Sequence, residues 1–220
     1  MNDSPFSFIS RHPSQSTGSP RSEAPDILPV HSGCVILYEG KESGNEEQAE
    51  VSYMSNYQHL AHEFPPVYDE NSRILILGSF PSVKSREQQF YYGHPQNRFW
   101  KILTAVFGEE IPETVEGRIV WLHEHRIALW DVIEECDILG SSDASIRSVV
   151  PTDVAEILKT ADIGHIYVNG GTAYRLFQRY QQKICGREAV RLPSTSPANA
   201  GWSLERLIEA WQCVGDAFKK

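Results

Sequence analysis

Apolar and polar positions along the chain predict a unit of alternating strands and helices from Arg73 onward. Short runs of apolar and β-branched residues predict strands at 73–77, 126–130, 164–168 and 188–192. Apolar positions that recur at helical spacing predict helices at 98–107, 115–125, 152–160, 172–182 and 203–218. Strands that alternate with helices form parallel sheets covered on both faces, so the pattern predicts an α/β fold with four parallel strands.

The front of the chain lacks this alternation. Residues 1–32 are rich in Ser, Pro and other polar residues, which predicts a largely disordered segment. The runs 34–38 and 49–53 are compatible with a small hairpin, and an acidic unstructured leader is the alternative. We therefore expect a leader over 1–57 and a folded, functional domain over 58–220.

Composition excludes several classes of protein. Hydrophobic residues make up 40% of the chain, which is enough for a sizeable core, and no apolar run reaches the length that spans a bilayer. The N-terminus lacks a positively charged start followed by an apolar stretch, so we expect no signal peptide, no membrane partner and a cytoplasmic protein. The cysteines are scattered without ligand spacing, which disfavours a metal site; they are Cys34, Cys136, Cys185 and Cys213.

The net charge of −9 first argues against a nucleic-acid partner. The acidity is concentrated at the front, however, because residues 1–72 hold 3 Lys and Arg against 11 Asp and Glu. Residues 73–220 are close to neutral, with 17 basic and 18 acidic residues. A local basic surface on this part is therefore compatible with nucleic-acid binding, although composition does not require it.

Unusual loops follow the four predicted strands. If the strands are parallel, these loops meet at one edge of the sheet, where open α/β sheets bind their ligands. The first loop alone is weak evidence, because a Gly-Ser turn after a strand also suits a phosphate site. The loops are Gly78 to Asn97, Asp131 after its strand, Asn169-Gly170-Gly171, and Pro193 to Asn199.

Four motifs on these loops carry a resemblance to a known family; they run from Gly78 to Ser82, Gln88 to Trp100, Ala128 to Ile133 and Leu192 to Asn199. In this order they resemble the DNA-deoxyinosine (hypoxanthine-DNA) glycosylases, a branch of the uracil-DNA glycosylase superfamily. The resemblance extends from about Phe64 to the C-terminus and does not cover residues 1–57. It implies a three-layer α/β/α domain with a central four-stranded parallel sheet. It also implies a monomer that hydrolyses the N-glycosidic bond of hypoxanthine in DNA and leaves an abasic site, without metal or organic cofactor.

Asn97 is the residue that we expect to be catalytic. An amide can accept a hydrogen bond from water through its oxygen and donate through its nitrogen, which suits the orientation of a hydrolytic water. The resemblance places the key asparagine of the family at this position. The alternative is structural, because Asn97 directly precedes a predicted helix and is a favourable N-cap residue. The two roles are compatible with each other.

The resemblance also implies the residues of a base pocket. Many members of the superfamily carry Asp or Asn where Phe80 stands and use it to activate water, whereas Phe80 can only shape or stack on a base. Leu192 stands where many relatives have a histidine, so the electrophilic contact that this histidine makes is absent too. These two differences favour the hypoxanthine branch over uracil-type catalysis. The predicted pocket consists of Gly78, Ser79, Phe80, Pro81, Tyr92, Asp131 and Asn169.

Three of these residues have structural alternatives. Asp131 stands where relatives place an asparagine that contacts the base edge; it can accept from the N1–H of hypoxanthine, or it can be an N-cap or a turn residue after the strand. Tyr92 can stack on the flipped base, although aromatic residues at a loop–helix junction usually belong to the core. Asn169 opens a Gly-Gly turn, which favours turn chemistry or an N-cap.

The hydroxyl and amide side chains of the loops predict DNA contacts, with an ordinary Ser/Pro surface loop as the alternative. Two other functions stay open: a glycosylase directed to uracil or xanthine, and a non-catalytic nucleotide- or nucleic-acid-binding module on the same fold. The acidic leader is a candidate to dock a partner protein or to compete with DNA. The predicted DNA-binding residues are Ser82, Ser194, Thr195, Ser196 and Asn199.

Overall fold

A computed structural model describes residues 56–218 of the protein, with the side chain of Phe218 left out. The predicted hairpin at 34–38 and 49–53 lies outside the described residues. The division into a leader over 1–57 and a domain over 58–220 stays a prediction.

The centre of the fold is a four-stranded parallel sheet, as the apolar runs predict. It consists of β2 (Ile74–Gly78), β3 (Ile127–Asp131), β6 (His165–Asn169) and β7 (Val190–Leu192). The strand order is β3-β2-β6-β7, and each neighbouring pair is parallel. The register pairs Gly78 with Asp131 and Asn169 with Leu192, so the carboxyl ends of all four strands lie at one edge.

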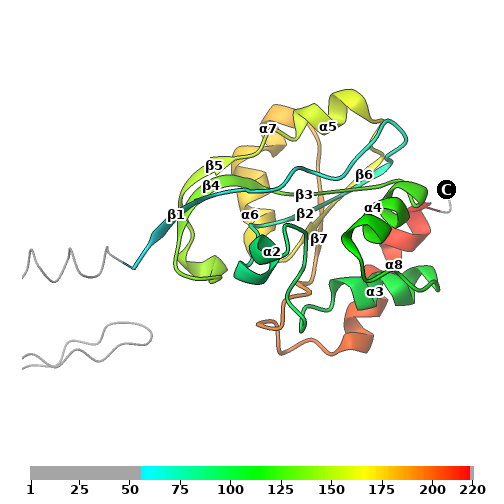
Figure 1. Cartoon of the computed structure of the whole chain (residues 1–220). Coiled ribbons are helices and arrows are strands. Elements are labelled where there is room, and N and C mark those ends of the chain that lie inside the picture. The colour runs from blue at the N-terminus through cyan, green and yellow to red at the C-terminus, as the bar shows by residue number, and fades with distance from the viewer. Residues whose placement is uncertain (1–55, 219–220) are drawn as a thin grey trace, which may run out of the picture. The chain divides into compact units, whose positions relative to one another are not determined.

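Helices cover both faces of this sheet and make the fold a three-layer α/β/α domain. In Figure 1, α5 and α7 lie above the sheet, and α3 and α8 pack side by side below it. All five predicted helices are confirmed to within a few residues; α2 and α7 are short additions. The helices are α2 (Val83–Glu87), α3 (Phe99–Phe107), α4 (Val115–Glu124), α5 (Ala155–Thr160), α6 (Gly171–Tyr180), α7 (Gln182–Cys185) and α8 (Leu204–Phe218).

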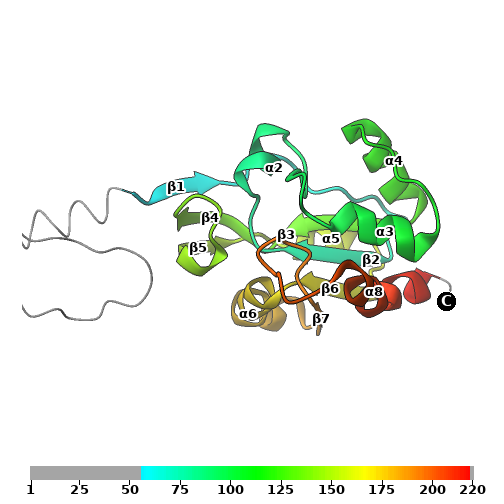
Figure 2. The ribbon, with the colours of Figure 1, turned by 90° about the horizontal axis from the view of Figure 1, so that it is seen from below.

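A second, antiparallel sheet was not predicted from the sequence. It consists of β1 (Gln58–Ala61), β4 (Ile133–Ile138) and β5 (Arg147–Pro151), in the order β1-β4-β5. Figures 1 and 2 show it beyond the carboxyl ends of β2 and β3. Because only Val132 separates β3 from β4, the chain continues directly from the central sheet into this one.

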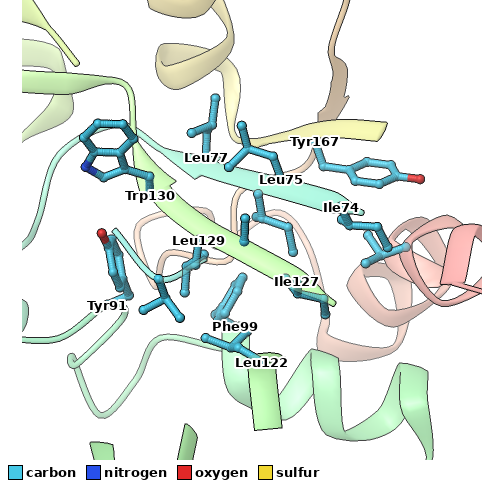
Figure 3. Close-up of a cluster of buried hydrophobic side chains, with 14 of the residues drawn as sticks. Ile74, Leu75, Leu77, Tyr91, Phe99, Leu122, Ile127, Leu129, Trp130 and Tyr167 are labelled. Atoms are coloured by element: carbon cyan, nitrogen blue, oxygen red, sulfur yellow. The ribbon is translucent and has the colours of Figure 1, made fainter. Parts of the chain in front are cut away.

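The core explains why the apolar runs predict the strands so well. All residues of β2 and β3 are buried, as expected for parallel strands covered on both faces. Figure 3 shows Leu75 and Leu129 among these buried side chains, with Phe99 from α3 and Leu122 from α4 packed close by. Each such side chain contributes about 1.5–3 kcal/mol when it leaves water, so the sheet is a firm base for the loops at its edge.

Candidate active site

A cavity of about 800 Å³ opens at the carboxyl edge of the central sheet. Residues at or directly after the carboxyl ends of all four strands contribute to its wall. The cavity therefore opens at the edge of the sheet where the strand order predicts a ligand site. All thirteen predicted site residues lie in its lining. They are Gly78, Ser79, Phe80, Pro81, Ser82, Tyr92, Asn97, Asp131, Asn169, Ser194, Thr195, Ser196 and Asn199.

A buried hydrogen-bond network holds Asn97. The hydroxyl of Thr195, which is completely buried, donates to Oδ1 of Asn97 at 2.8 Å. The same hydroxyl accepts from Nδ2 of Asn169 at 2.9 Å, and Oδ1 of Asn169 accepts from the backbone N–H of Thr195 at 3.0 Å. The three residues come from three different loops, so the network connects the ends of β6 and β7 to the start of α3.

Asn97 also supports the start of α3, as its structural alternative predicts. Its Oδ1 accepts from the backbone N–H of Phe99 at 3.0 Å, while the side chain of Arg98, the residue at the cap position, makes no capping hydrogen bond. Oδ1 therefore accepts two hydrogen bonds, which uses both of its lone pairs. Among the described residues no acceptor binds Nδ2 of Asn97. This group can therefore donate a hydrogen bond into the cavity.

Asn169 does not act as the predicted helix cap. Gly170 is the cap residue of α6, and no side chain caps this helix. Both polar atoms of Asn169 bind Thr195 instead. Asn169 as a whole residue is 9% exposed, so it lines the cavity mainly as a support for its neighbours.

A buried carboxylate, Asp131, ends β3. Its Oδ2 lies 3.1 Å from Nε2 of His62, and the two side chains are 6% and 1% exposed. On its other side, Oδ1 lies against the backbone of Gly78; a Cβ on Gly78 would be only 2.1 Å from it. A carboxylate removed from water needs partners of this kind. His62 therefore holds Asp131 in place, and the absence of a side chain on Gly78 makes room for it.

His62 was not singled out from the sequence. It lies in the segment that follows β1, 69 residues before Asp131, and no local pattern indicates the contact. Its ring packs edge-on against Phe64, with centroids 4.6 Å apart, and close to Tyr91. These contacts place an ionisable side chain in an aromatic surrounding.

Aromatic side chains form the apolar wall of the cavity. The ring of Tyr92 stacks on Phe99 at 3.8 Å between centroids, so one face of Tyr92 belongs to the core, as the alternative interpretation predicts. Tyr92 has a φ of 54°, which L side chains rarely adopt. Burial raises the pKa of its hydroxyl well above the usual value, and the negative charge of Asp131 adds to this shift. Phe80 is buried and packs on Ile133 of the second sheet.

The loop from Pro193 to Trp202 is held by one arginine. The guanidinium of Arg98 donates to the carbonyl groups of Ser196 at 2.7 Å and Asn199 at 3.1 Å, and also to that of Trp202. The side chain and backbone N–H of Arg98 both donate to the carbonyl of Thr195. Arg98 belongs to a motif quoted from the sequence, but its role follows only from the fold.

The serine hydroxyl groups of this loop can still donate a hydrogen bond. Oγ of Ser194 accepts from the backbone N–H of Ser196, and Oγ of Ser196 accepts from that of Ala198, each at 3.2 Å. Nδ2 of Asn199 donates to the carbonyl of Ser194 at 2.8 Å. An oxygen that accepts in this way still has its own O–H to donate. The two serines can therefore bind an anionic oxygen, while Asn199 shapes the loop.

Three further features complete the description of this part of the chain. Within residues 56–218 no group of His, Cys, Asp and Glu side chains could hold a metal ion. None of the helices in this range is long and apolar enough to cross a bilayer. Among the described residues that line the cavity, Arg191 in β7 is the one lysine or arginine.

Comparison with known proteins places this cavity in a family. The sequence model of the uracil DNA glycosylase superfamily matches residues 65–215, which span the whole central sheet and α8 up to Gly215. The chain belongs to the uracil DNA glycosylase superfamily. The resemblance of the four loop motifs to this superfamily is thereby confirmed.

Relatives of known structure or description agree with this assignment. The chain is 36% identical over 155 residues to a "Hypoxanthine DNA glycosylase" of Methanosarcina acetivorans, covering 69% of this chain and 95% of the relative. It is 42% identical over 85 residues to a protein of the same description from Methanosarcina barkeri, covering 38% and 54%. A solution NMR structure from Methanosarcina acetivorans, described as a presumed uracil DNA glycosylase, has a TM-score of 0.62 at 34% identity and covers 71% and 97%.

Proposed function

We propose that the protein is a DNA glycosylase that excises hypoxanthine from deoxyinosine and leaves an abasic site. Superfamily membership and the description of two relatives support this function. The observation that carries the choice of base is Asp131, a buried carboxylate held by His62 at the wall of an otherwise aromatic cavity. To enter this cavity, the base leaves the stack of the duplex.

A carboxylate at this position favours a base with a donor at its edge. Ionised Asp131 only accepts hydrogen bonds, and hypoxanthine presents N1–H as a donor. Adenine presents an acceptor at N1, which the carboxylate repels, so normal adenine is rejected at the same contact. His62 fixes the position of the carboxylate, because its Nε2 lies 3.1 Å from Oδ2 of Asp131.

Asn97 acts on the hydrolytic water as a donor. Since Oδ1 already accepts from Thr195 and Phe99, the amide orients the water through Nδ2. Asn97 thus keeps the role that its motif predicts, which is to orient the water, but it does so only as a hydrogen-bond donor. A fixed donor supplies positioning, which is a large part of the catalytic effect in a hydrolysis without metal ions.

The rim of the cavity supplies the contacts to DNA. Ser194 and Ser196 offer O–H donors from a loop whose carbonyl groups are bound by Arg98, and Ser82 also lines the cavity. Arg191 adds a positive charge. Contacts of this kind position the phosphate backbone without reading sequence. Thr195 differs from this prediction, because its completely buried hydroxyl serves the Asn97 network and not the DNA.

The test is a panel of defined duplexes that each contain one deoxyinosine, deoxyuridine or deoxyxanthosine. We expect release of hypoxanthine and an alkali-sensitive abasic site at the deoxyinosine, with slower release of uracil. Preferred release of uracil would contradict the role of Asp131 and favour the uracil-directed alternative. Tight binding without release of any base would contradict an enzyme and favour the non-catalytic binding module.

A further inference from the structure

The cavity lining contains two carboxylates, and only one of them is engaged in holding the base. Among the described residues of the lining, the acidic side chains are Asp131 and Asp143. Asp131 is fixed between His62 and Gly78 at the end of β3. Asp143 comes from a part of the chain to which the sequence motifs assign no function.

Asp143 lies at the same turn as the predicted base pocket. It opens the short 3-10 helix Asp143–Ser145 in the connection between β4 and β5. Its Oδ1 accepts from the hydroxyl of Ser79 at 2.9 Å, directly next to Phe80 in the chain. The connection is also attached at Ser141, whose Oγ accepts from the backbone N–H of Val83 at 3.0 Å. Two hydrogen bonds thus hold this connection against the 78–82 turn.

The hydrolytic water requires an acceptor for its proton, and the other groups of the cavity do not supply one. Both lone pairs of Asn97 Oδ1 are used by Thr195 and Phe99. Phe80 has no polar atom. Asp131 is already bound to His62, and in the proposed function it contacts the base edge. By elimination within the described lining, the remaining acceptor of suitable basicity is the carboxylate of Asp143.

We propose that Asp143 is the general base of the reaction and that its negative charge also faces the developing cation of the sugar. The inference rests on the proposed glycosylase function and adds to it a residue outside the sequence motifs. In the step, the C1′–N9 bond breaks and its electron pair leaves with hypoxanthine as the anion. The water oxygen forms the new bond to C1′, its proton passes to the carboxylate of Asp143, and the purine anion takes a proton from solvent.

The surroundings of Asp143 suit this role. Asp143 is an exposed residue, and partial loss of hydration raises the pKa of its carboxyl; the charge of Asp131 raises it further, and Ser79 and Arg175 oppose the shift. Other titratable groups that sense its charge are Tyr92 and Cys136. A base with a raised pKa accepts a proton more readily than an ordinary aspartate.

The central experiment compares Asp143→Asn with the wild-type full-length chain under single-turnover conditions on the deoxyinosine duplex. We expect the rate of base release to fall about 100- to 10,000-fold, the usual contribution of a general base, with unchanged or tighter DNA binding. The matched control is Asp162→Asn, an exposed carboxylate before β6 at the opposite edge of the sheet, which should behave as wild type.

The pH profile separates a base from a structural residue. The wild-type rate should increase with pH as Asp143 ionises, and this increase should be absent in Asp143→Asn. Ser79→Ala removes a hydrogen bond that lowers the pKa, so the increase should move to higher pH while the carboxylate remains. Because Ser79→Ala keeps Asp143, it tests the idea even if the asparagine variant folds poorly. A profile that neither variant changes would overturn the assignment.

A binding measurement decides the inference independently of turnover. Wild type should bind a duplex with a cationic pyrrolidine at the lesion more tightly than one with neutral tetrahydrofuran, and Asp143→Asn should lose this preference. If the wild type releases no base but Asp143→Asn loses the preference, the proposed function fails and the electrostatic role stands. If hypoxanthine is released and the variant keeps both its rate and the preference, the inference fails and the proposed function stands.

Discussion

Thr195→Val tests whether the buried network orients Asn97. The substitution keeps the volume and removes the hydroxyl that donates to Asn97 at 2.8 Å and accepts from Asn169 at 2.9 Å. Asn97 Oδ1 retains Phe99 as a donor, whereas Nδ2 of Asn169 loses its partner in a buried place. A buried polar group without a partner costs about 1–3 kcal/mol, so we expect the free energy of unfolding to fall by about 2 kcal/mol.

The same substitution should lower the rate of base release. If the lost hydrogen bond contributes about 1.4 kcal/mol to the orientation of Asn97 in the transition state, the rate falls about tenfold. The assay is single-turnover excision from the deoxyinosine duplex at a temperature where every variant is folded, together with urea unfolding.

Two controls separate orientation from stability. Thr195→Ser keeps the hydroxyl and should retain most of the rate. Thr152→Val removes another buried hydroxyl with two hydrogen bonds, to the carbonyl of Asp131 and from Gln181, so it should lose similar stability. Equal rates for Thr195→Val and Thr195→Ser, with both proteins folded, would refute the reasoning that the network positions Asn97.

Three further outcomes follow from the site. Asn97→Ala should keep most of the DNA affinity and lose most of the turnover in the same assay; unchanged turnover would reduce Asn97 to its support of α3. His62→Leu removes one partner of a buried pair and should lower the free energy of unfolding in urea by about 3–5 kcal/mol. His62→Gln can still donate to Asp131 and should lose clearly less. Equal losses in the two variants would contradict the contact. Gly78→Ala places a Cβ 2.1 Å from Oδ1 of Asp131, so it should lower the free energy of unfolding by about 1–3 kcal/mol and also lower turnover. In the control Gly164→Ala the new Cβ meets only a backbone oxygen at 3.6 Å, and this variant should be tolerated.

Sequence patterns predict the central sheet well because its strands are buried on both faces. A strand such as β2, with Ile74 to Leu77 in a continuous apolar run, has few alternatives in a protein of this size. The helices are predicted for a similar reason, since each presents an apolar side to the sheet. The antiparallel sheet was missed because β4 contains Glu134, Glu135 and Asp137, and because no residue of β5 is buried. Such strands form through pairing with their neighbours, which no local pattern reveals.

The positions of the predicted site residues follow from the order of strands and loops. All thirteen line one cavity because a parallel sheet brings the ends of its strands to one edge. Their roles are a different matter. Asn169 is a natural cap or turn residue by local criteria, yet both of its polar atoms bind Thr195, 26 residues away. Contacts at such separations depend on packing and are not encoded in a spacing.

The sequence by itself therefore determined the class of fold, the edge of the sheet at which the cavity opens and the superfamily, because these depend on apolar runs and on short motifs that each lie within one loop. The tertiary structure decided the chemistry within that edge. It brought His62 to Asp131 across 69 residues and filled the lone pairs of Asn97. It also placed Asp143, from the connection between two strands of the unpredicted sheet, beside Ser79. The physical reason is that burial and hydrogen bonding, which set the state of each polar group, arise only when distant segments meet.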